Sequence, residues 1–359
     1  MEFYEHNKKL FEELRERIDK NPDNTENYLL LGKLYVMGVM YDEAIEIYDL
    51  LLQKDPLNIQ ALINSGSIYF FKKDYEKAVN LFTRALETDS ANASCYYNLG
   101  NAYAELKNYN HAMQSYKKAL ALDTKNPEIY TAIALLHQDL NEFPDAIANF
   151  QKALAFNPDD AEANNNLGCA FVKIKMYEEA VYHFKKAIEA DPQNPKTVLC
   201  CANAYSALKQ YENAEKYFEK TIEIDPKYYN AYICKAISLC DEGKINEAYE
   251  VYDKATEVDP ARINAYVLKA NLKVSDREFA EALKLYKKAI EIEPNSPKIY
   301  IHAGNTCVLT HDLIGAIKDY KKAVGLLPDD DEIKLLYYDT IRDYINEKSK
   351  KEQSSEFTQ

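Results

Sequence analysis

The chain repeats itself every 34 residues, and this periodicity constrains its fold more than any other feature of the sequence. Nine repeats follow one another from Thr25 to Asp330 without an insertion or deletion, so each can be compared position by position. A period of this length is typical of a solenoid, in which every repeat is one supersecondary unit stacked on its neighbours. The repeats span 25–58, 59–92, 93–126, 127–160, 161–194, 195–228, 229–262, 263–296 and 297–330.

Three positions of the repeat carry side chains of fixed size. Position 20 is alanine in all nine repeats, and position 24 is tyrosine or phenylalanine in all nine, from Tyr48 to Tyr320. Residues four apart share one face of a helix, so a small side chain lies beside a large one in every repeat. Position 8 is always glycine or alanine, and we expect two backbones to approach closely there.

Each repeat is predicted to form two amphipathic helices. Apolar residues recur at spacings of three and four in positions 4–11 and again in positions 17–28. Prolines such as Pro56 end the second helix, and residues such as Asn58 cap the next first helix. One pair cannot bury its apolar face alone, so the pairs must stack. We expect capping helices in residues 1–24 and 331–347 and a disordered tail over 348–359.

These positions resemble the tetratricopeptide repeat (TPR) family, which has small residues at positions 8, 20 and 27, aromatic residues at 4, 11, 17 and 24, and proline at 32. The third repeat departs from this pattern only at Thr124, which replaces the proline. The resemblance implies an all-α, right-handed superhelical solenoid of nine TPR helix-turn-helix units with N- and C-terminal capping helices. It also implies a concave groove lined by the first helices, and binding of other proteins as the common activity. The residues of the third repeat that match are Tyr96, Leu99, Gly100, Tyr103, Tyr109, Ala112, Tyr116 and Ala119.

Asparagine is frequent at the positions that would line this groove, which are 2, 5, 6, 9, 12 and 13. An amide offers two donors and one acceptor, so a row of amides can hold the backbone of an extended peptide without demanding a particular side chain. Apolar neighbours such as Ile63 and Phe70 would add side-chain pockets. The alternative is that each asparagine is a solvated helix residue. The candidate groove residues are Asn64, Asn98, Asn101, Asn165, Asn166, Asn203, Asn230, Asn264, Asn271 and Asn305.

Charges at the groove positions are few. The basic clamp with which family members hold the acidic C-termini of heat-shock chaperones is missing, so we do not expect chaperone docking. The asparagines are similar to those in the repeats of O-linked N-acetylglucosamine transferases, but no transferase domain follows here. The charged groove residues are Glu26, Glu105, Glu128, Asp139, Glu162 and Asp241, against Lys33, Lys173, Lys196 and Lys298.

Three lysines break the apolar pattern of the seventh and eighth repeats. Lys235 and Lys269 occupy position 7 and Lys273 occupies position 11, where packing residues are usual. A buried ammonium group needs a carboxylate or a path to water, so these side chains either extend to solvent or pair with carboxylates between repeats. We also predict that stacking is weakest near 235–273, which would make these repeats a hinge or a partner-specific site.

The overall composition excludes several classes of partner. A formal net charge of −14 disfavours nucleic acid and anionic lipid, and RNA binding through a helical-repeat code would need a basic groove. No apolar run is long enough to cross a bilayer, so no membrane insertion is expected. The acidic N-terminal residues do not fit a secretory signal, which favours a cytoplasmic protein with reduced cysteines.

We find no catalytic or metal-binding pattern. His137 replaces an aromatic residue at position 11 and is interpreted as a core residue. Zinc ligation by groove cysteines is disfavoured, because successive helix layers are roughly 10 Å apart. The cysteines at groove positions are Cys169, Cys200, Cys234 and Cys240.

The sequence thus predicts a scaffold or adaptor that binds an extended or helical segment of a partner protein or peptide in its groove. We expect it to be noncatalytic, with no cofactor and no metal. The alternative is a structural subunit that self-assembles into a homo-oligomer through its convex or end surfaces.

Overall fold

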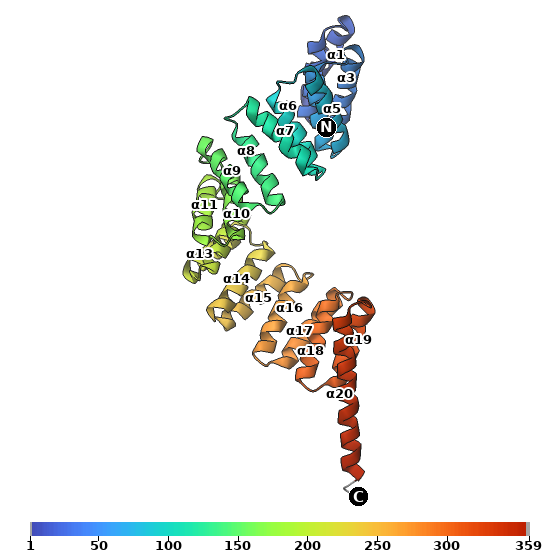
Figure 1. Ribbon diagram of the computed structural model, residues 1–359, viewed down its shortest axis with the longest axis vertical. Helices are drawn as coiled ribbons and strands as arrows, with labels where there is room; N and C mark the ends of the chain where they lie inside the picture. The colour runs from blue at the N-terminus through green and yellow to red at the C-terminus, as the bar shows by residue number, and fades with distance from the viewer. Residues whose placement is uncertain (1, 357–359) are drawn as a thin grey trace. The chain divides into compact units, whose positions relative to one another are not determined.

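The computed structural model describes residues 2–356, with side chains for residues 3–350, and this part of the chain folds into twenty α-helices (Figure 1). It forms two compact units, an N-terminal unit of Met1–Ala190 and a C-terminal unit of Asp191–Gln359. The N-terminal unit contains α1 (Glu2–Lys20), α2 (Thr25–Met37), α3 (Tyr41–Lys54), α4 (Ile59–Phe71), α5 (Tyr75–Thr88), α6 (Ala93–Glu105), α7 (Tyr109–Leu122), α8 (Pro127–Asp139), α9 (Phe143–Phe156), α10 (Ala161–Lys173) and α11 (Tyr177–Ala190). The C-terminal unit contains α12 (Pro195–Ala207), α13 (Tyr211–Ile224), α14 (Tyr229–Glu242), α15 (Ile245–Val258), α16 (Ile263–Ser275), α17 (Phe279–Ile292), α18 (Pro297–Leu309), α19 (Leu313–Leu326) and α20 (Asp331–Glu356).

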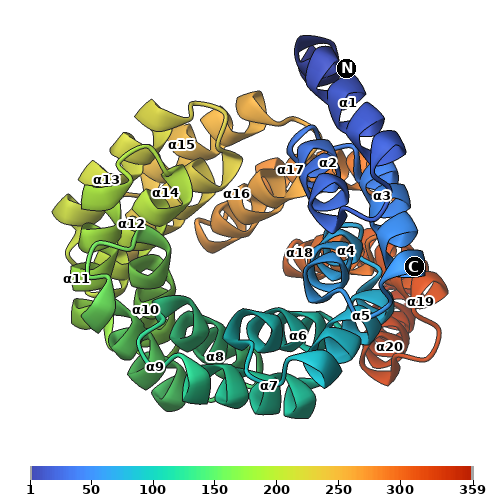
Figure 2. The same cartoon turned by 90° about the horizontal axis from the view of Figure 1, so that it is seen from above.

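The predicted all-α fold of paired helices is confirmed. From α2 to α19, each even-numbered helix begins at position 1 of a repeat and each odd-numbered helix at position 17. Within each unit, consecutive pairs stack as in a TPR solenoid. In the N-terminal unit the first helices, α4, α6, α8 and α10, follow the inner side of the curve and their second helices follow the outer side (Figure 2).

The C-terminal end differs from the sequence prediction. The helix expected over 331–347 continues to Glu356, so the prediction of a disordered tail is wrong for residues 348–356. Residues 357–359, the remainder of that predicted tail, lie outside the described chain. The extension is rich in Lys, Glu and Gln, which favour helix in the absence of tertiary contacts. In Figure 1, α20 accordingly runs on beyond its neighbour α19.

The small residue that recurs at position 8 has a different cause from the close approach of two backbones that the sequence predicted. A Cβ atom built on Gly66 would lie 2.7 Å from Cε1 of Phe82, the position-24 aromatic residue of the same repeat. The missing side chain at position 8 therefore makes room for a ring and not for a second backbone. The position-20 alanines are fully buried as well, so each helix pair has room for one large side chain between two small ones.

The turn inside each pair has the same backbone conformation throughout. Position 15 has a positive φ in all nine repeats, as in Lys107 (57°) and Gly243 (90°), although only the latter is glycine. The next residue donates its amide to the carbonyl at position 11, as from Asn108 to Tyr103 (2.9 Å), while Lys107 donates to Ala104 (2.8 Å). These two bonds form a Schellman motif, which ends the first helix and fixes where the second one starts.

Candidate peptide-binding groove

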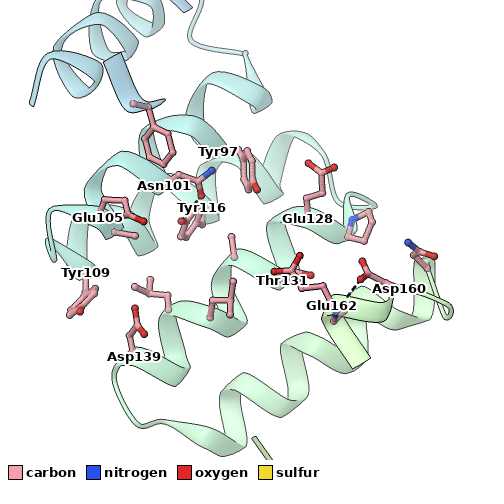
Figure 3. A pocket seen from close by; sticks show the side chains of 18 of the residues that line it. Tyr97, Asn101, Glu105, Tyr109, Tyr116, Glu128, Thr131, Asp139, Asp160 and Glu162 are labelled. Atoms are coloured by element: carbon pink, nitrogen blue, oxygen red, sulfur yellow. Dashed lines mark hydrogen bonds between the residues drawn. The ribbon is translucent and has the colours of Figure 1, made fainter. Parts of the chain in front are cut away.

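One pocket of the N-terminal unit lies along the inner helices α6, α8 and α10 (Figure 3). It has a volume of about 760 Å³. Its lining combines tyrosine rings, an asparagine amide and a row of carboxylates, and eleven of its nineteen residues occupy the predicted groove positions. The lining residues include Phe70, Tyr97, Asn101, Glu105, Lys107, Tyr109, Tyr116, Glu128, Thr131, Leu135, Asp139, Asp160 and Glu162.

Four of the carboxylates form two pairs along this pocket, which we call the acidic pocket. Glu105 and Asp139 occupy position 13 at the ends of α6 and α8, and Glu128 and Glu162 occupy position 2 at the starts of α8 and α10. Figure 3 shows the two pairs at opposite sides of the pocket, with Asn101 and Thr131 between them. All four side chains are exposed. Among the described residues, no lysine, arginine or histidine comes within ion-pair distance of any of them.

The fifth carboxylate has a structural role. Asp160 precedes α10, and its Oδ1 accepts the backbone N–H of Ala163 at 2.9 Å. This is an N-cap bond, which satisfies one of the unpaired donors at the start of a helix. Asp160 is therefore occupied by its own helix, whereas Glu105 is hydrogen-bonded to the Tyr75 side chain and none of the four other carboxylates caps a helix.

The negative charge also affects a buried tyrosine. Burial raises the pKa of the Tyr116 hydroxyl, and the charges of Tyr97, Glu105 and Asp139 raise it further. A neighbouring negative charge disfavours a second one, so the phenol stays protonated and acts as a donor.

A smaller pocket, the apolar pocket, lies on α2 and α4 of the same unit. It has a volume of about 420 Å³. Two of its side chains are large and open to solvent, Leu30 with 46% of its surface exposed and Phe71 with 64%. Phe70, the residue before Phe71, lines the acidic pocket, so α4 contributes to both. The remaining apolar lining comes from Leu29, Val36 and Ile68.

Three of the four asparagines at position 9 are held by the tyrosine at position 24 of the same repeat. The hydroxyl of Tyr116 donates to Oδ1 of Asn101 at 2.7 Å, and the same bond joins Tyr286 to Asn271 and Tyr320 to Asn305 at 2.6 Å each. Because the oxygen of each amide accepts this bond, its NH₂ group is oriented away from the tyrosine. These asparagines therefore combine a structural role with a fixed pair of donors.

The other predicted asparagines divide between the two pockets, internal contacts and the open surface. Asn64 lines the apolar pocket, and its Nδ2 donates to the Tyr48 hydroxyl at 3.1 Å. Asn203 bonds to the Cys234 side chain. Asn98, Asn165 and Asn166 are half-buried on the first helices of their repeats and line neither pocket, and Asn203, Asn230, Asn264 and Asn305 are exposed. The structure thus brings two of the ten residues, Asn64 and Asn101, into pockets.

The three unusual lysines of the C-terminal unit are paired. Nζ of Lys235 lies 3.3 Å from Glu219 and 3.5 Å from Glu215, both on the second helix of the preceding repeat. Lys269 pairs with Asp253, again on the preceding repeat. The interpretation as carboxylate pairs between repeats is therefore confirmed for these two lysines. The predicted hinge stays a prediction, to be tested by hydrogen exchange.

Lys273 pairs with a carboxylate of its own repeat and contacts a ring of the preceding one. Its Nζ lies 2.8 Å from Glu278 and 3.9 Å from the centre of the Tyr249 ring. This arrangement combines an ion pair with a cation–π contact. Its charge is thus neutralised locally.

His137 belongs to the one group of described side chains whose ligand atoms gather closely enough for a metal ion, together with Glu142 and Asp145. Its Nδ1 lies 2.7 Å from Oε2 of Glu142, so the imidazole already has a protein partner. Both carboxylates are exposed and lie at the start of α9. We assign no metal to this group. In the described part of the chain, no helix is both long enough and apolar enough to cross a membrane.

Comparison with protein families finds two matches. The family described as the cilia and flagella-associated protein 70 C-terminal domain matches residues 6–225. A tetratricopeptide repeat family matches residues 263–296, the eighth repeat. No curated protein matches the chain.

Solved structures with the same fold include several bacterial repeat proteins. A tetratricopeptide repeat protein from Parabacteroides merdae is 25% identical, with a TM-score of 0.53 over 69% of this chain and 98% of its own. The C-terminal part of a TPR protein from Cytophaga hutchinsonii is 20% identical, with a TM-score of 0.50 over 76% and 97%. PilF of Pseudomonas aeruginosa is 21% identical, with a TM-score of 0.51 over 56% and 92%.

Proposed function

Because this chain belongs to the family of the cilia and flagella-associated protein 70 C-terminal domain, whose helix pairs are tetratricopeptide repeats, we propose that it is a noncatalytic interaction scaffold. Its partner is a protein or peptide, and an extended segment of that partner lies in the groove of the N-terminal unit. The single observation that carries the proposal is the fixed orientation of the groove amides. The amide oxygen of Asn101 accepts a hydrogen bond from the Tyr116 hydroxyl, and its NH₂ group is therefore oriented away from that tyrosine.

A donor fixed in advance suits the main chain of an extended segment. Each peptide group of the partner offers a carbonyl oxygen, whatever its side chain. Since the amide of Asn101 is already ordered in the free protein, binding requires less ordering of that side chain. Open apolar side chains such as Leu135, 37% exposed, add contact area beside this amide. The groove can thus bind a backbone through amides and select side chains through its pockets.

We propose that the protein acts inside the cell, in the cytoplasm. The name of the matched family refers to cilia and flagella, which makes the cilium the compartment to inspect first. Imaging of the tagged chain in a ciliated cell tests this placement. Exclusion of the tag from the cilium would restrict the proposal to the cell body.

Photo-crosslinking tests which face binds the partner. A photoreactive phenylalanine replaces Leu135 in the acidic pocket or, as the matched control, Tyr182 on the outer helix α11, which is 60% exposed. After irradiation in cell extract, we expect one partner segment to be joined to position 135 and not to position 182. Equal labelling at both positions, or labelling only at 182, would contradict the proposal.

An asparagine variant tests the amides themselves. Asn64→Ala combined with Asn101→Ala should release the crosslinked partner, because both pocket amides are then lost. The control is Asn80→Ala with Asn110→Ala, two exposed asparagines on the second helices α5 and α7. Tyr116→Phe leaves the amide in the groove but removes the bond that orients it, so it should weaken the crosslink less than the double asparagine variant.

Self-assembly is a second candidate function, favoured by the last helix. Leu335, Tyr338 and Ile345 lie on one side of α20 and are 61%, 62% and 54% exposed. An apolar stripe of this kind often marks a contact with another protein. Sedimentation of the purified chain should show an oligomer. The substitutions Leu335→Ser, Tyr338→Ser and Ile345→Ser should dissociate it. A monomer at every concentration would rule this function out.

A further inference from the structure

The acidic pocket and the apolar pocket lie in one unit and share α4, and together they indicate what kind of segment the groove accepts. We infer that the N-terminal unit binds a basic segment with an apolar anchor, namely lysine or arginine residues preceded or followed by a bulky apolar residue. This inference rests on the proposed function, because it names the partner class of the same groove. It is argued from charge, ring chemistry and spacing.

The charge of the acidic pocket is not neutralised by a described basic side chain. Glu105 is hydrogen-bonded to the Tyr75 side chain, and Glu128 and Glu162 lie in the first turns of α8 and α10, where a negative charge is favoured. Glu105, Glu128, Asp139 and Glu162 are exposed and, in the part of the chain that the structure describes, have no ion-pair partner. Only one basic side chain, that of Lys107, lines the pocket. Like charges in a concave site create a potential that attracts the opposite charge and speeds association. A basic segment is therefore complementary to this site.

The placement of the four carboxylates favours a chain of cations over a metal ion. The pair at position 13 and the pair at position 2 are separated along the inner helices by eleven residues, about 16 Å at 1.5 Å per residue. Among the described side chains, these carboxylates do not gather into a metal-sized group. A peptide that lies between the two pairs would meet carboxylates on both of its sides. Successive side chains of an extended segment point to opposite sides, which suits this arrangement.

The aromatic lining suits the same side chains. Tyr97, Tyr109 and Tyr116 line the acidic pocket together with Phe70. Guanidinium and ammonium groups bind to the faces of such rings, and their aliphatic stems cover apolar surface. Lysine and arginine can thus use both the carboxylates and the rings, whereas an acidic or a small polar side chain can use neither.

The apolar pocket adds an anchor at a defined distance. Its most exposed apolar residue, Phe71, lies on α4, two to three repeats before α8 and α10. Packed helix layers are roughly 10 Å apart, and an extended chain advances about 3.3 Å per residue. An anchor in the apolar pocket therefore precedes or follows the basic residues by about six to nine positions, and a segment of about twelve residues covers both pockets.

Defined peptides test the inference on the full chain. The first probe is a fluorescein-labelled 12-residue peptide with Leu-Phe at one end and four alternating Arg and Lys residues at the other. The second has Glu in place of the basic residues, and the third has Ser-Ser in place of Leu-Phe. Fluorescence anisotropy at about 0.15 M salt, where long-range attraction is screened within about 8 Å, should show that the first binds at least tenfold tighter than the second.

Two sets of variants separate the pocket from general attraction to an acidic protein. The pocket set is Glu105→Gln, Glu128→Gln, Asp139→Asn and Glu162→Gln, and the control set is Glu43→Gln, Glu87→Gln, Glu178→Gln and Glu179→Gln, four exposed glutamates on the second helices α3, α5 and α11. Both sets change the net charge equally. We expect the pocket set to weaken binding of the first peptide at least tenfold and the control set less than twofold. Equal losses for the two sets would overturn the inference.

The anchor has its own test. Phe71→Ser should weaken the first peptide severalfold and leave the third peptide unchanged, since the third has no apolar residue to lose. Weakening of both peptides by the same factor would overturn the anchor. If the basic peptides bind no tighter than the acidic one while crosslinking still places a partner at position 135, the inference fails and the proposed function stands.

Discussion

The two units have the same helix pairs but treat the charges on their first helices in opposite ways. In the C-terminal unit, Lys235 and Lys269 are only 14% and 15% exposed and pair with carboxylates of the preceding repeat. In the N-terminal unit, acids such as Glu128 and Glu162 stay exposed without a charged partner. Both sets, the lysines and the acids, are charged side chains on the first helices of their repeats. One set joins neighbouring repeats, whereas the other leaves a charge open to a ligand.

The contrast between the units gives a criterion for candidate binding residues inside a repeat. A charged residue that contributes to stacking finds its partner within the protein, because a buried charge without a partner is costly. A charged residue that is kept exposed in a pocket near others of the same sign is a candidate for binding a ligand of opposite charge. The distinction depends on contacts and cannot be read from residue type alone.

The largest expected effect tests whether the cores of the two units are equivalent. Ala146→Leu and Ala282→Leu place a large side chain at position 20, where both alanines are fully buried beside an aromatic ring. Each change should lower the free energy of unfolding by about 1–3 kcal/mol, because overpacking forces strained rotamers. Urea unfolding measures both. A value near zero in one unit would show that its core is not packed as described.

The next effect concerns the bond between positions 9 and 24. Tyr116→Phe in the N-terminal unit and Tyr286→Phe in the C-terminal unit each remove a hydroxyl that donates to an asparagine. We expect each to cost about 0.5–1.5 kcal/mol, the usual net value of such a bond. Asn101→Ala should then add little to Tyr116→Phe in a double-mutant cycle. Fully additive losses would contradict the pairing.

Charge removal should separate the units most directly. Lys235→Met keeps the aliphatic stem and removes the pairs with Glu215 and Glu219, so we expect a loss of up to about 1 kcal/mol that shrinks with added salt. Glu128→Gln removes a charge that has no ion-pair partner but lies in the first turn of α8, so stability should change by less than about 0.5 kcal/mol in either direction. Denaturation at two salt concentrations checks both. A larger loss for Glu128→Gln than for Lys235→Met would break the comparison.

The smallest effect is a pH dependence shared by the units. Burial lowers the pKa of His183, whose Nδ1 lies 3.0 Å from Asn164 Oδ1, and burial together with Lys298 lowers the pKa of His302. The unfolded chain then binds more protons than the folded chain as the pH falls through about 6.5, the ordinary histidine value. Stability is therefore full above that pH and decreases below it. His183→Gln should flatten part of this slope in unfolding measured at about pH 7.5 and about pH 5.5.

The sequence alone predicted the fold closely, because the same pattern of small and large residues occurs in all nine repeats. Alternation of small and large residues at positions 8, 20 and 24 located both helices and the core. The left-handed residue at position 15 was not predicted, since eight of its nine occupants are not glycine. The helical extension to Glu356 was also missed, because a polar composition suits both a solvated helix and a disordered segment.

The site was predicted less completely than the fold. Position-by-position comparison selected Asn64 and Asn101, which line pockets, and their role in binding stays a prediction. It counted the groove charges over the whole chain, and this total concealed that four of the six acids lie in one pocket. A count made repeat by repeat would have found them. The bonds from tyrosine to asparagine depend on side-chain direction across the pair, which spacing does not specify.

The Schellman turn at positions 11–16 has a consequence for how such a chain can change in length. Each of the nine turns uses the same two backbone bonds, so one added or deleted residue would break them and misplace the second helix. Whole repeats can be gained or lost without touching any turn. Groove length and groove chemistry are thus inherited separately: duplication lengthens the surface in steps of one repeat, and substitutions at its exposed positions decide what each step binds.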